Sequence, residues 1–197
     1  MLDFDKIEKN ARERHIPIIL DEGRDELIKL VRECRPKRVL EIGTAIGYSG
    51  SLILSNAPSD CILDTIELLE DRRAEAIENF TCCGVENRVN SYLGDAMELL
   101  EKVVCGNTYD LVFIDGPKSK YKQYLDIIKP HIRLGGYVFC DNVLFRGMVR
   151  RESKPPHKFR TIVVGLRKFL DYIENSLDYD VQILEKGDGI AIIKVIK

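Results

Sequence analysis

The chain contains no tryptophan, only three histidines, and no apolar run approaching the roughly 20 residues that a bilayer-spanning helix needs. The missing apolar run excludes a transmembrane helix. The opening residues, MLDFDKIEKNARERH, are mostly charged, which argues against a secretory signal peptide with its apolar core. We therefore expect no membrane partner and a cytoplasmic location.

The cysteines form no recognisable metal or disulfide pattern. None of the six belongs to a C-x-x-C pair, and with only three histidines a zinc site is not expected. Most lie among apolar residues, as Cys140 does in GGYVFC, which is typical of reduced core cysteines in a cytosolic protein. A chain of this length buries roughly 70% of its unfolded surface and needs no disulfides to fold.

The length of 197 residues predicts one domain over 1–197. Its N-terminal part, 1–35, is predicted to be helical, with a weak helix over Asp3–His15 and a better one over Asp21–Glu33. The remainder, 36–197, begins an alternation of β and α segments. We interpret it as the α/β core.

Short apolar runs recur along the core with helical stretches between them, which is typical of a doubly wound α/β fold. Each run resembles a parallel strand buried on both faces. The last two runs flank Lys186-Gly187-Asp188-Gly189 and predict an antiparallel hairpin. The fold class is therefore α/β, a mostly parallel seven-stranded sheet with helices on both faces and a C-terminal hairpin. The predicted strands are Arg38–Ile42, Cys61–Glu67, Arg88–Leu93, Tyr109–Asp115, Gly136–Cys140, Tyr179–Leu184 and Ile190–Ile196, and the predicted helices of the core include Leu69–Cys82, Asp95–Val103 and Phe159–Ile173.

Charge is distributed unevenly along the chain. The net charge is −2, yet 143–168 holds eight basic residues and one acidic residue, a net charge of +7. Such segregation indicates that a polyanion meets one face of the molecule. On charge alone, a solvated loop and helix face is an equally good interpretation.

Ligands of doubly wound folds bind at the carboxyl ends of the strands, so the residues there are the first candidates for a site. After the first strand, Gly43 and Gly47 have the spacing G-x-x-x-G, which differs from the dinucleotide pattern G-x-G-x-x-G and argues against a pyrophosphate cofactor. Glu67 ends the second strand, where a carboxylate can bind two ribose hydroxyls. Asp95 follows the third and can flank an adenine, cap the next helix, or do both.

Oxygen-bearing side chains follow the fourth and fifth strands. Asp115 ends one, and Asp141 and Asn142 end the other. Two carboxylates and an amide suit Mg²⁺, and two buried carboxylates this close would repel each other without a cation. Lys118 lies three residues after Asp115 and is a candidate general base, although it can also be a solvated lysine beside Lys120.

These segments resemble the cation-dependent, catechol O-methyltransferase-like family of class I S-adenosylmethionine-dependent methyltransferases. The resemblance is carried by VLEIGTAIGYS at 39–49, IE at 66–67, GDA at 94–96, FIDGPKSKY at 113–121 and CDNVLFRG at 140–147. It runs from about Ile16 to the C-terminus. Within the family the chain is most similar to the bacterial tRNA 5-hydroxyuridine methyltransferases, through IPII at 16–19 and the basic stretch after Asn142.

The resemblance implies a role for each strand-end residue. It implies that S-adenosylmethionine is held by Ile19, Glu41, Gly43, Ser49, Glu67, Asp95, Ala96 and Asp115. It implies that Asp115, Asp141 and Asn142 bind Mg²⁺ or Mn²⁺, and that Lys118 and Asp115 are catalytic, with Lys118 as the base. It also suggests a homodimer.

The substrate is less determined. A histidine and a tryptophan often follow the first metal aspartate in enzymes for free catechols, whereas Gly116 and Pro117 stand here, which argues against an aromatic gate. The basic segment favours tRNA, whose 5-hydroxyuridine offers two adjacent oxygens, and its predicted RNA contacts are Arg146, Arg150, Arg151, Lys158 and Arg160. The alternative substrate is a small catechol-like or phenolic metabolite, including an acyl-CoA thioester. A non-catalytic nucleoside- or RNA-binding module is a hypothesis of another class, and the complete acidic set weighs against it.

Overall fold

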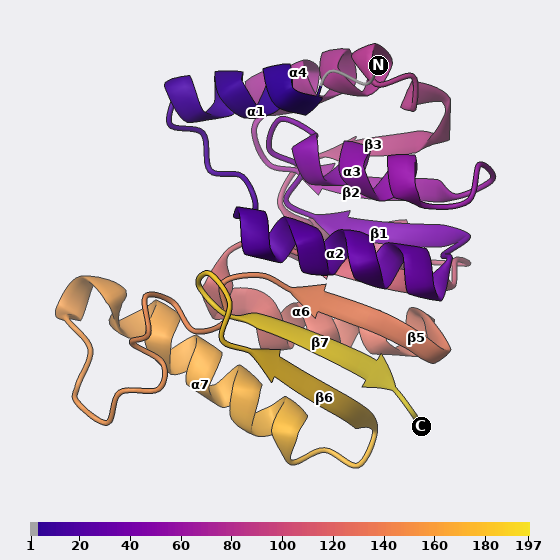
Figure 1. Ribbon diagram of the computed structural model, residues 1–197. Coiled ribbons are helices and arrows are strands. Elements are labelled where there is room, and N and C mark those ends of the chain that lie inside the picture. Colours follow the sequence, from indigo (N-terminus) through magenta and orange to yellow (C-terminus); the bar gives the residue numbers. More distant parts are fainter. Residues whose placement is uncertain (1–3) are drawn as a thin grey trace.

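Five parallel strands and a C-terminal antiparallel pair form one sheet in the computed structural model, which describes residues 4–197 (Figure 1). The strand order is β3-β2-β1-β4-β5-β7-β6, with β7 antiparallel to both β5 and β6. This confirms the predicted fold class. The strands are β1 Arg38–Ile42, β2 Ile62–Glu67, β3 Val89–Leu93, β4 Tyr109–Ile114, β5 Ile132–Cys140, β6 Tyr179–Leu184 and β7 Ile190–Val195.

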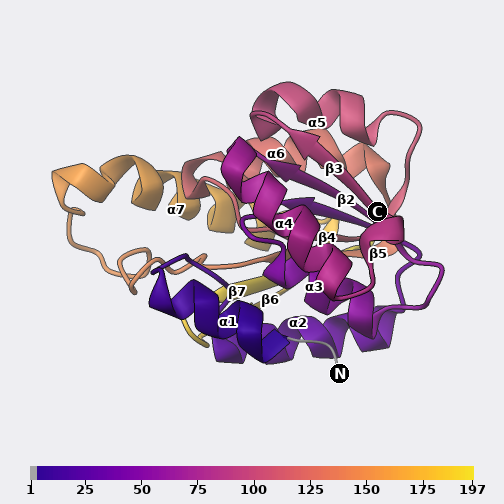
Figure 2. The same ribbon diagram turned by 90° about the horizontal axis from the view of Figure 1, so that it is seen from above.

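Helices cover both faces of the sheet, as Figure 2 shows from above. One hydrophobic cluster packs α1, α2, α3 and α4 against one face, and a second packs α5, α6 and α7 against the other. The helices are α1 Phe4–Glu13, α2 Asp21–Cys34, α3 Tyr48–Asn56, α4 Glu70–Cys82, α5 Ala96–Val104, α6 Tyr121–Ile128 and α7 Arg160–Glu174, with short 3-10 turns η1 Glu86–Arg88, η2 Lys118–Lys120, η3 Lys129–His131 and η4 His157–Phe159. Asp3, where the first helix was predicted to begin, lies outside the described residues.

The central strands are buried on both faces because helices cover both sides. Every residue of β4 is buried, as are all but the first residue of β1 and of β2. The strand order reverses at β1, which pairs with β2 on one side and β4 on the other. The crevice beyond the carboxyl ends of β1 and β4 is therefore where a ligand is expected.

The start of one strand and two helices, α3 and α6, differ from the prediction. The fifth strand begins at Ile132, four residues before Gly136, because pairing with β4 continues across a register shift near Gly135, whose φ is +79°. Helix α3 was not predicted; almost all of it is buried, so its sequence YSGSLILSN has no polar face to indicate a helix. Within residues 4–197, no helix has the length and apolar character needed to cross a membrane.

Candidate active site

A cavity of about 1170 Å³ opens at the carboxyl ends of the parallel strands. Its wall is formed by residues that follow β1 to β5, by the connector between α1 and α2, and by the turn between β6 and β7. Of the predicted site residues, those on the wall are Gly43, Glu67, Asp95, Ala96, Asp115, Lys118, Asn142 and Arg146. Ile19, Glu41, Ser49 and Asp141 are buried and do not line it. Neither do Arg150, Arg151, Lys158 and Arg160.

Gly43 lets the loops after β1 and β4 touch through their backbones. Its φ is +98°, and a Cβ atom built there would lie 2.5 Å from the carbonyl oxygen of Asp115. The Asp115 N–H donates to the Ile42 carbonyl at 2.9 Å, and the Gly43 N–H donates to the Ile66 carbonyl at 3.1 Å. Any larger residue at 43 would separate these loops and widen the cavity floor.

Glu41 supports the glycine loop from behind the wall. It is fully buried, and its carboxylate accepts hydrogen bonds from the hydroxyls of Ser49 and Thr65, each at 2.5 Å. Burial raises the pKa of Glu41 to about 7; the two hydroxyls oppose this shift, and the charges of Asp115 and Glu67 add to it. Contact of Glu41 and Ser49 with the cofactor stays a prediction.

Glu67 and Asp95 both hold backbone N–H groups and still face the cavity. The Glu67 carboxylate accepts from the N–H of Ala45 at 2.8 Å and from that of Leu69 at 3.0 Å. A carboxylate has about four lone-pair positions, so acceptor capacity is left for ribose hydroxyls. Asp95 is the N-cap of α5 and accepts from the Met97 N–H at 2.7 Å. It therefore combines the capping role with a place on the wall.

The acidic residues after β4 and β5 lie near one another. Lys118 forms an ion pair with the Asp115 carboxylate, and the Asp141 carboxylate accepts from the Asn142 N–H at 2.8 Å. Burial raises the pKa of Asp141 to about 7, and the charge of Asp115 raises it further, whereas Lys118 opposes the shift. Two anionic groups thus destabilise each other in a poorly solvated place, which is the condition a divalent cation relieves.

The donor set fits a hard cation better than a transition metal. Among residues 4–197, no three His, Cys, Asp or Glu side chains gather as a metal-ligand group. The third protein oxygen here would come from the amide of Asn142, which lines the cavity beside Asp115. Two carboxylates and an amide leave positions for water or substrate oxygens, as Mg²⁺ prefers.

The wall after β5 is conformationally strained. Of the six non-glycine residues with positive φ among residues 4–197, four line the cavity: Ala45 (45°), Asn142 (57°), Phe145 (41°) and Arg146 (55°). Such residues cost roughly 1–3 kcal/mol each and persist where their surroundings hold them. The turn between β6 and β7 does so, because the Arg146 N–H donates to the Asp188 carboxylate.

Sequence reasoning gave no role to Asp188 or to Tyr121. Asp188 was noted only as part of a hairpin turn, yet it lines the cavity and its charge adds to the raised pKa of Asp141. Tyr121 is fully buried in α6, and its hydroxyl donates to carbonyls at the ends of both β4 and β5. The hydroxyl of a buried tyrosine needs a polar partner, so a tyrosine on the apolar face of a helix indicates a buried hydrogen bond.

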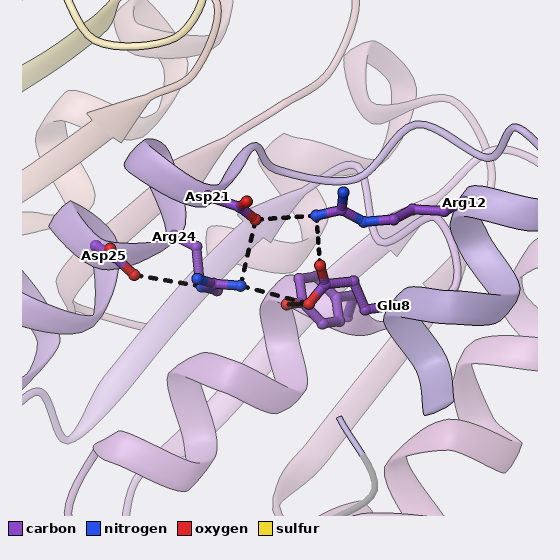
Figure 3. Close-up of polar contacts among 6 residues, drawn as sticks. Glu8, Arg12, Asp21, Arg24 and Asp25 are labelled. Atoms are coloured by element: carbon purple, nitrogen blue, oxygen red, sulfur yellow. Dashed lines mark hydrogen bonds and ion pairs between the residues drawn. The ribbon is translucent and has the colours of Figure 1, made fainter. Parts of the chain in front are cut away.

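A charged network fixes the connector that forms one side of the cavity (Figure 3). Its members are Glu8, Arg12, Asp21, Arg24, Asp25 and Tyr48. Glu8 on α1 accepts from Arg24 on α2 at 3.4 Å and from the Tyr48 hydroxyl on α3 at 3.0 Å. Burial raises the pKa of Glu8, but the hydrogen bonds from Tyr48 and Arg12 outweigh it and leave that pKa lowered. Helices α1 and α2, which flank the connector, are thus tied to α3, the helix that follows the glycine loop.

The basic segment leaves the strand end and runs outward toward α7 (Figure 1). Arg167 is a structural member of it, because its guanidinium donates to the carbonyls of Val149 at 3.0 Å, Met148 at 3.2 Å and Arg151. The other seven basic residues are exposed: Arg146, Arg150, Arg151, Lys154, Lys158, Arg160 and Lys168. Of these seven, only Arg150 forms an ion pair within the described part of the chain, at 3.6 Å from Glu174.

The chain is similar to known O-methyltransferases over nearly its whole length. Residues 6–196 match the family model described as O-methyltransferase. A caffeoyl-CoA O-methyltransferase of Populus kitakamiensis is 30% identical over 183 residues, which cover 88% of this chain and 75% of that protein. A catechol O-methyltransferase of Niastella koreensis is 28% identical over 170 residues, covering 83% and 75%.

A solved structure shares both the fold and the cofactor class. The O-methyltransferase TomG from Streptomyces achromogenes, involved in tomaymycin synthesis and crystallised in complex with S-adenosylmethionine, superposes with a TM-score of 0.86. It is 26% identical, and the match covers 98% of this chain and 89% of that one. The similarity therefore includes the N-terminal helices as well as the sheet.

Proposed function

This chain belongs to the O-methyltransferase family, and from that premise we propose that it holds its acceptor oxygen at a divalent cation and that the acceptor is the 5-hydroxyl of 5-hydroxyuridine in tRNA. At the level of the family, the activity is S-adenosylmethionine-dependent O-methylation of the caffeoyl-CoA and catechol O-methyltransferase type. The fit of the acidic set to a hard cation supports the first part of the proposal. The exposed, unpaired cations support the second.

The cation would be held by Asp115, Asp141 and the amide oxygen of Asn142. When bound, Mg²⁺ or Mn²⁺ supplies positive charge that favours the ionised acceptor hydroxyl and orients it. The charge of Asp115 supports this assignment, because it adds to the effect of burial in raising the pKa of Asp141, and a bound cation would offset both.

The methyl donor would occupy the part of the cavity between β1, β2 and β3. Glu67, Asp95 and Ala96 line this part of the cavity, where Glu67 would bind the ribose hydroxyls and the other two would flank the adenine. The loop at Gly43 would receive the methionine end, and Ile19 is a buried residue of the connector on the same side of the cavity. The bound cofactor would supply an electrophilic methyl group, which the acceptor oxygen would attack in line as the bond between sulfur and methyl breaks and S-adenosylhomocysteine is released.

Lys118 would handle the acceptor proton. It lies on the cavity wall, three residues after Asp115 and in contact with it. In its neutral form the Nζ atom can accept the proton as the acceptor oxygen becomes nucleophilic, and Asp115 then stabilises the resulting ammonium. Positioning and charge stabilisation would supply most of the rate enhancement.

The unpaired cations carry the tRNA part of the proposal. Within 143–168, six exposed cations stand close together in the sequence and have no carboxylate partner among residues 4–197. Arg146 and Lys158 lie over the ring of Phe159, at 5.5 and 4.7 Å from its centroid. Unpaired cations beside aromatic rings suit single-stranded nucleic acid.

A catecholic acyl-CoA thioester is the second candidate acceptor. The similarity to a caffeoyl-CoA O-methyltransferase favours it, and so does Arg146, a cation on the cavity wall that can meet an anionic carrier. A thioester offers a few phosphates near the cavity, whereas tRNA offers many along the whole segment. The two candidates therefore differ in how many of the outer cations they use.

The decisive experiment measures methyl transfer from labelled S-adenosylmethionine to three acceptors: tRNA that carries 5-hydroxyuridine, caffeoyl-CoA and catechol. Each reaction is run with Mg²⁺ and with EDTA. We expect transfer to the tRNA that EDTA abolishes. Turnover of caffeoyl-CoA or catechol without any tRNA methylation would reject the tRNA proposal, and undiminished activity in EDTA would reject the cation.

Asp141→Ala tests the cation site separately. Turnover should fall by at least about 100-fold, the scale of losing one transition-state charge interaction. Asp180→Ala, at an exposed position on β6, is the matched control. Calorimetric binding of S-adenosylmethionine should be nearly unchanged in Asp141→Ala. Wild-type turnover by the variant would refute the ligand role.

A further inference from the structure

A second hollow, of about 490 Å³, lies between α7 and the start of α6, outside the cavity described above. One side is formed by Ser119, Lys122 and Gln123, and the other by Arg160, Thr161, Val164, Gly165 and Lys168. On α7 these residues recur at helical spacing, so they form one row along the helix. The hollow has no acidic residue in its lining.

The lining is rich in hydrogen-bond donors and carries uncompensated positive charge. Lys122 is neutralised by Asp126, at 2.8 and 3.0 Å, and its ammonium lies 4.2 Å from the centroid of the Tyr172 ring. Arg160 and Lys168 are exposed and form no ion pair within residues 4–197. The hydroxyls of Ser119 and Thr161 and the amide of Gln123 complete a donor set that suits a phosphate.

The hollow is physically continuous with the turn that holds the proposed base. Ser119 follows Lys118 in the chain, and η2 packs directly under α7. A Cβ atom at Gly165 would lie 2.9 Å from Ser119 Cα and 3.2 Å from its carbonyl oxygen. A group bound in the hollow would therefore rest on the same turn that presents Lys118 to the main cavity.

We propose that this hollow is a phosphate subsite for the acceptor RNA, in which Arg160 and Lys168 hold a backbone phosphate near the nucleotide that is methylated. The proposal rests on the proposed tRNA function and specifies where the RNA backbone is held. Thr161 lies in the first turn of α7, a helix of 15 residues without a side-chain N-cap, so the positive end of the helix dipole adds to the attraction for an anion. The phosphates of coenzyme A share this chemistry, and the experiment separates them from RNA.

The test compares the wild-type protein with Arg160→Gln/Lys168→Gln. The charge-conserving variant is Arg160→Lys/Lys168→Arg. The matched control, Lys9→Gln/Lys29→Gln, removes two exposed cations from α1 and α2. Binding of fluorescein-labelled, 5-hydroxyuridine-containing tRNA is followed by anisotropy over a KCl series. Coenzyme A binding is measured by calorimetry on the same proteins, and thermal melts verify that each is folded.

We expect the glutamine pair to weaken RNA binding by at least about tenfold, or about 1.4 kcal/mol, because it removes two charge-assisted contacts with phosphate. The slope of log K against log salt should become shallower by about 1 to 2. The charge-conserving pair should keep most of the affinity, and the α1/α2 control should keep all of it.

Three results overturn the proposal in distinguishable ways. Wild-type affinity and salt slope in the glutamine pair, with the wild-type protein methylating tRNA, would reject the subsite and leave the proposed function intact. Binding of coenzyme A by the wild type and its loss in the glutamine pair, with RNA binding unchanged, would assign the hollow to a thioester carrier. If the wild type neither binds nor methylates the tRNA, the proposed function fails and the subsite with it.

Discussion

The Tyr121 hydroxyl donates to the carbonyl oxygen of Asp141 at 2.8 Å and reaches that of Ile114 at 3.2 Å. Tyr121 belongs to α6, whereas the two carbonyls belong to the ends of β5 and β4. One buried phenol therefore joins the two strand ends whose next side chains, Asp115 and Asp141, form the proposed cation site. The same helix begins directly after the turn that carries Lys118, so the positions of base and acids are linked.

Tyr121→Phe should loosen these two strand ends. It leaves two buried carbonyls without this donor, so we expect a loss of about 1 kcal/mol in the free energy of unfolding. Catalysis should suffer more, with kcat lower by severalfold to tenfold, because small displacements of catalytic groups are costly. Urea denaturation and methyl-transfer kinetics measure the two effects. Tyr137→Phe on β5, whose ring keeps its contact with Lys194, is the control. Equal kcat in both variants would contradict the positioning role.

Stability should fall as pH rises through neutrality, and Glu41 should contribute to this. Its pKa is about 7 in the folded protein, above the ordinary 4.5, so between these values the folded state binds more protons than the unfolded state. The free energy of unfolding must then decrease with rising pH, by at most about 1.4 kcal/mol per unit for one group. Asp141, with its pKa also raised to about 7, acts in the same direction.

Glu41→Gln isolates that contribution. The amide cannot ionise, so the curve of unfolding free energy against pH should be flatter between pH 5 and pH 8 than for the wild type, with a residual slope from Asp141. Urea titrations at four pH values over this range give the comparison. A slope identical to that of the wild type would show that Glu41 is ionised throughout.

Gly165→Ala should destabilise the protein, although the same change in an open helix stabilises it by up to about 1 kcal/mol. The added methyl group meets the backbone of Ser119 at 2.9 Å, and a backbone segment cannot rotate away as a side chain can. We expect a loss of about 1–3 kcal/mol, the usual range for overpacking. Denaturant unfolding measures it, and an increase in stability would mean that the turn moves freely away from α7.

The same variant should lower kcat, because it displaces the turn that presents Lys118. Gly165→Ser adds a hydroxyl at the same point and should lower both the free energy of unfolding and kcat further. An unchanged kcat in a destabilised Gly165→Ala protein would show that the packing of α7 on this turn does not affect catalysis.

Glu8→Ala should weaken cofactor binding from a position on α1. Removing this carboxylate takes a partner from Arg24 and from Tyr48, so the connector along the cavity loses its anchor. We expect the Kd for S-adenosylmethionine to rise several-fold, with a smaller effect on turnover at saturation. Glu13→Ala, on the same helix and in an exposed pair with Lys9, is the control. Calorimetry measures the Kd for S-adenosylmethionine, and equal Kd values for Glu8→Ala and the wild type would rule out the anchoring role.

Much of this arrangement could be predicted from local patterns. The seven strands and the hairpin follow from apolar runs and turn residues, because burial between two helix layers requires continuous apolar strands. The strand ends then identify Gly43, Glu67, Asp95, Asp115 and Asp141, because a parallel sheet gathers its carboxyl ends at one edge. These are consequences of short-range periodicity and of one topological rule.

Contacts between residues far apart in the chain were decided by packing. No local pattern brings Asp188 to the wall after β5, links Glu8 to Tyr48, or places Gly165 on Ser119. Arg167 looked like one more surface cation, yet it holds three carbonyls of the loop after β5. Such roles depend on which helix crosses which turn, and that is set by the fit of whole side-chain surfaces rather than by spacing along the chain.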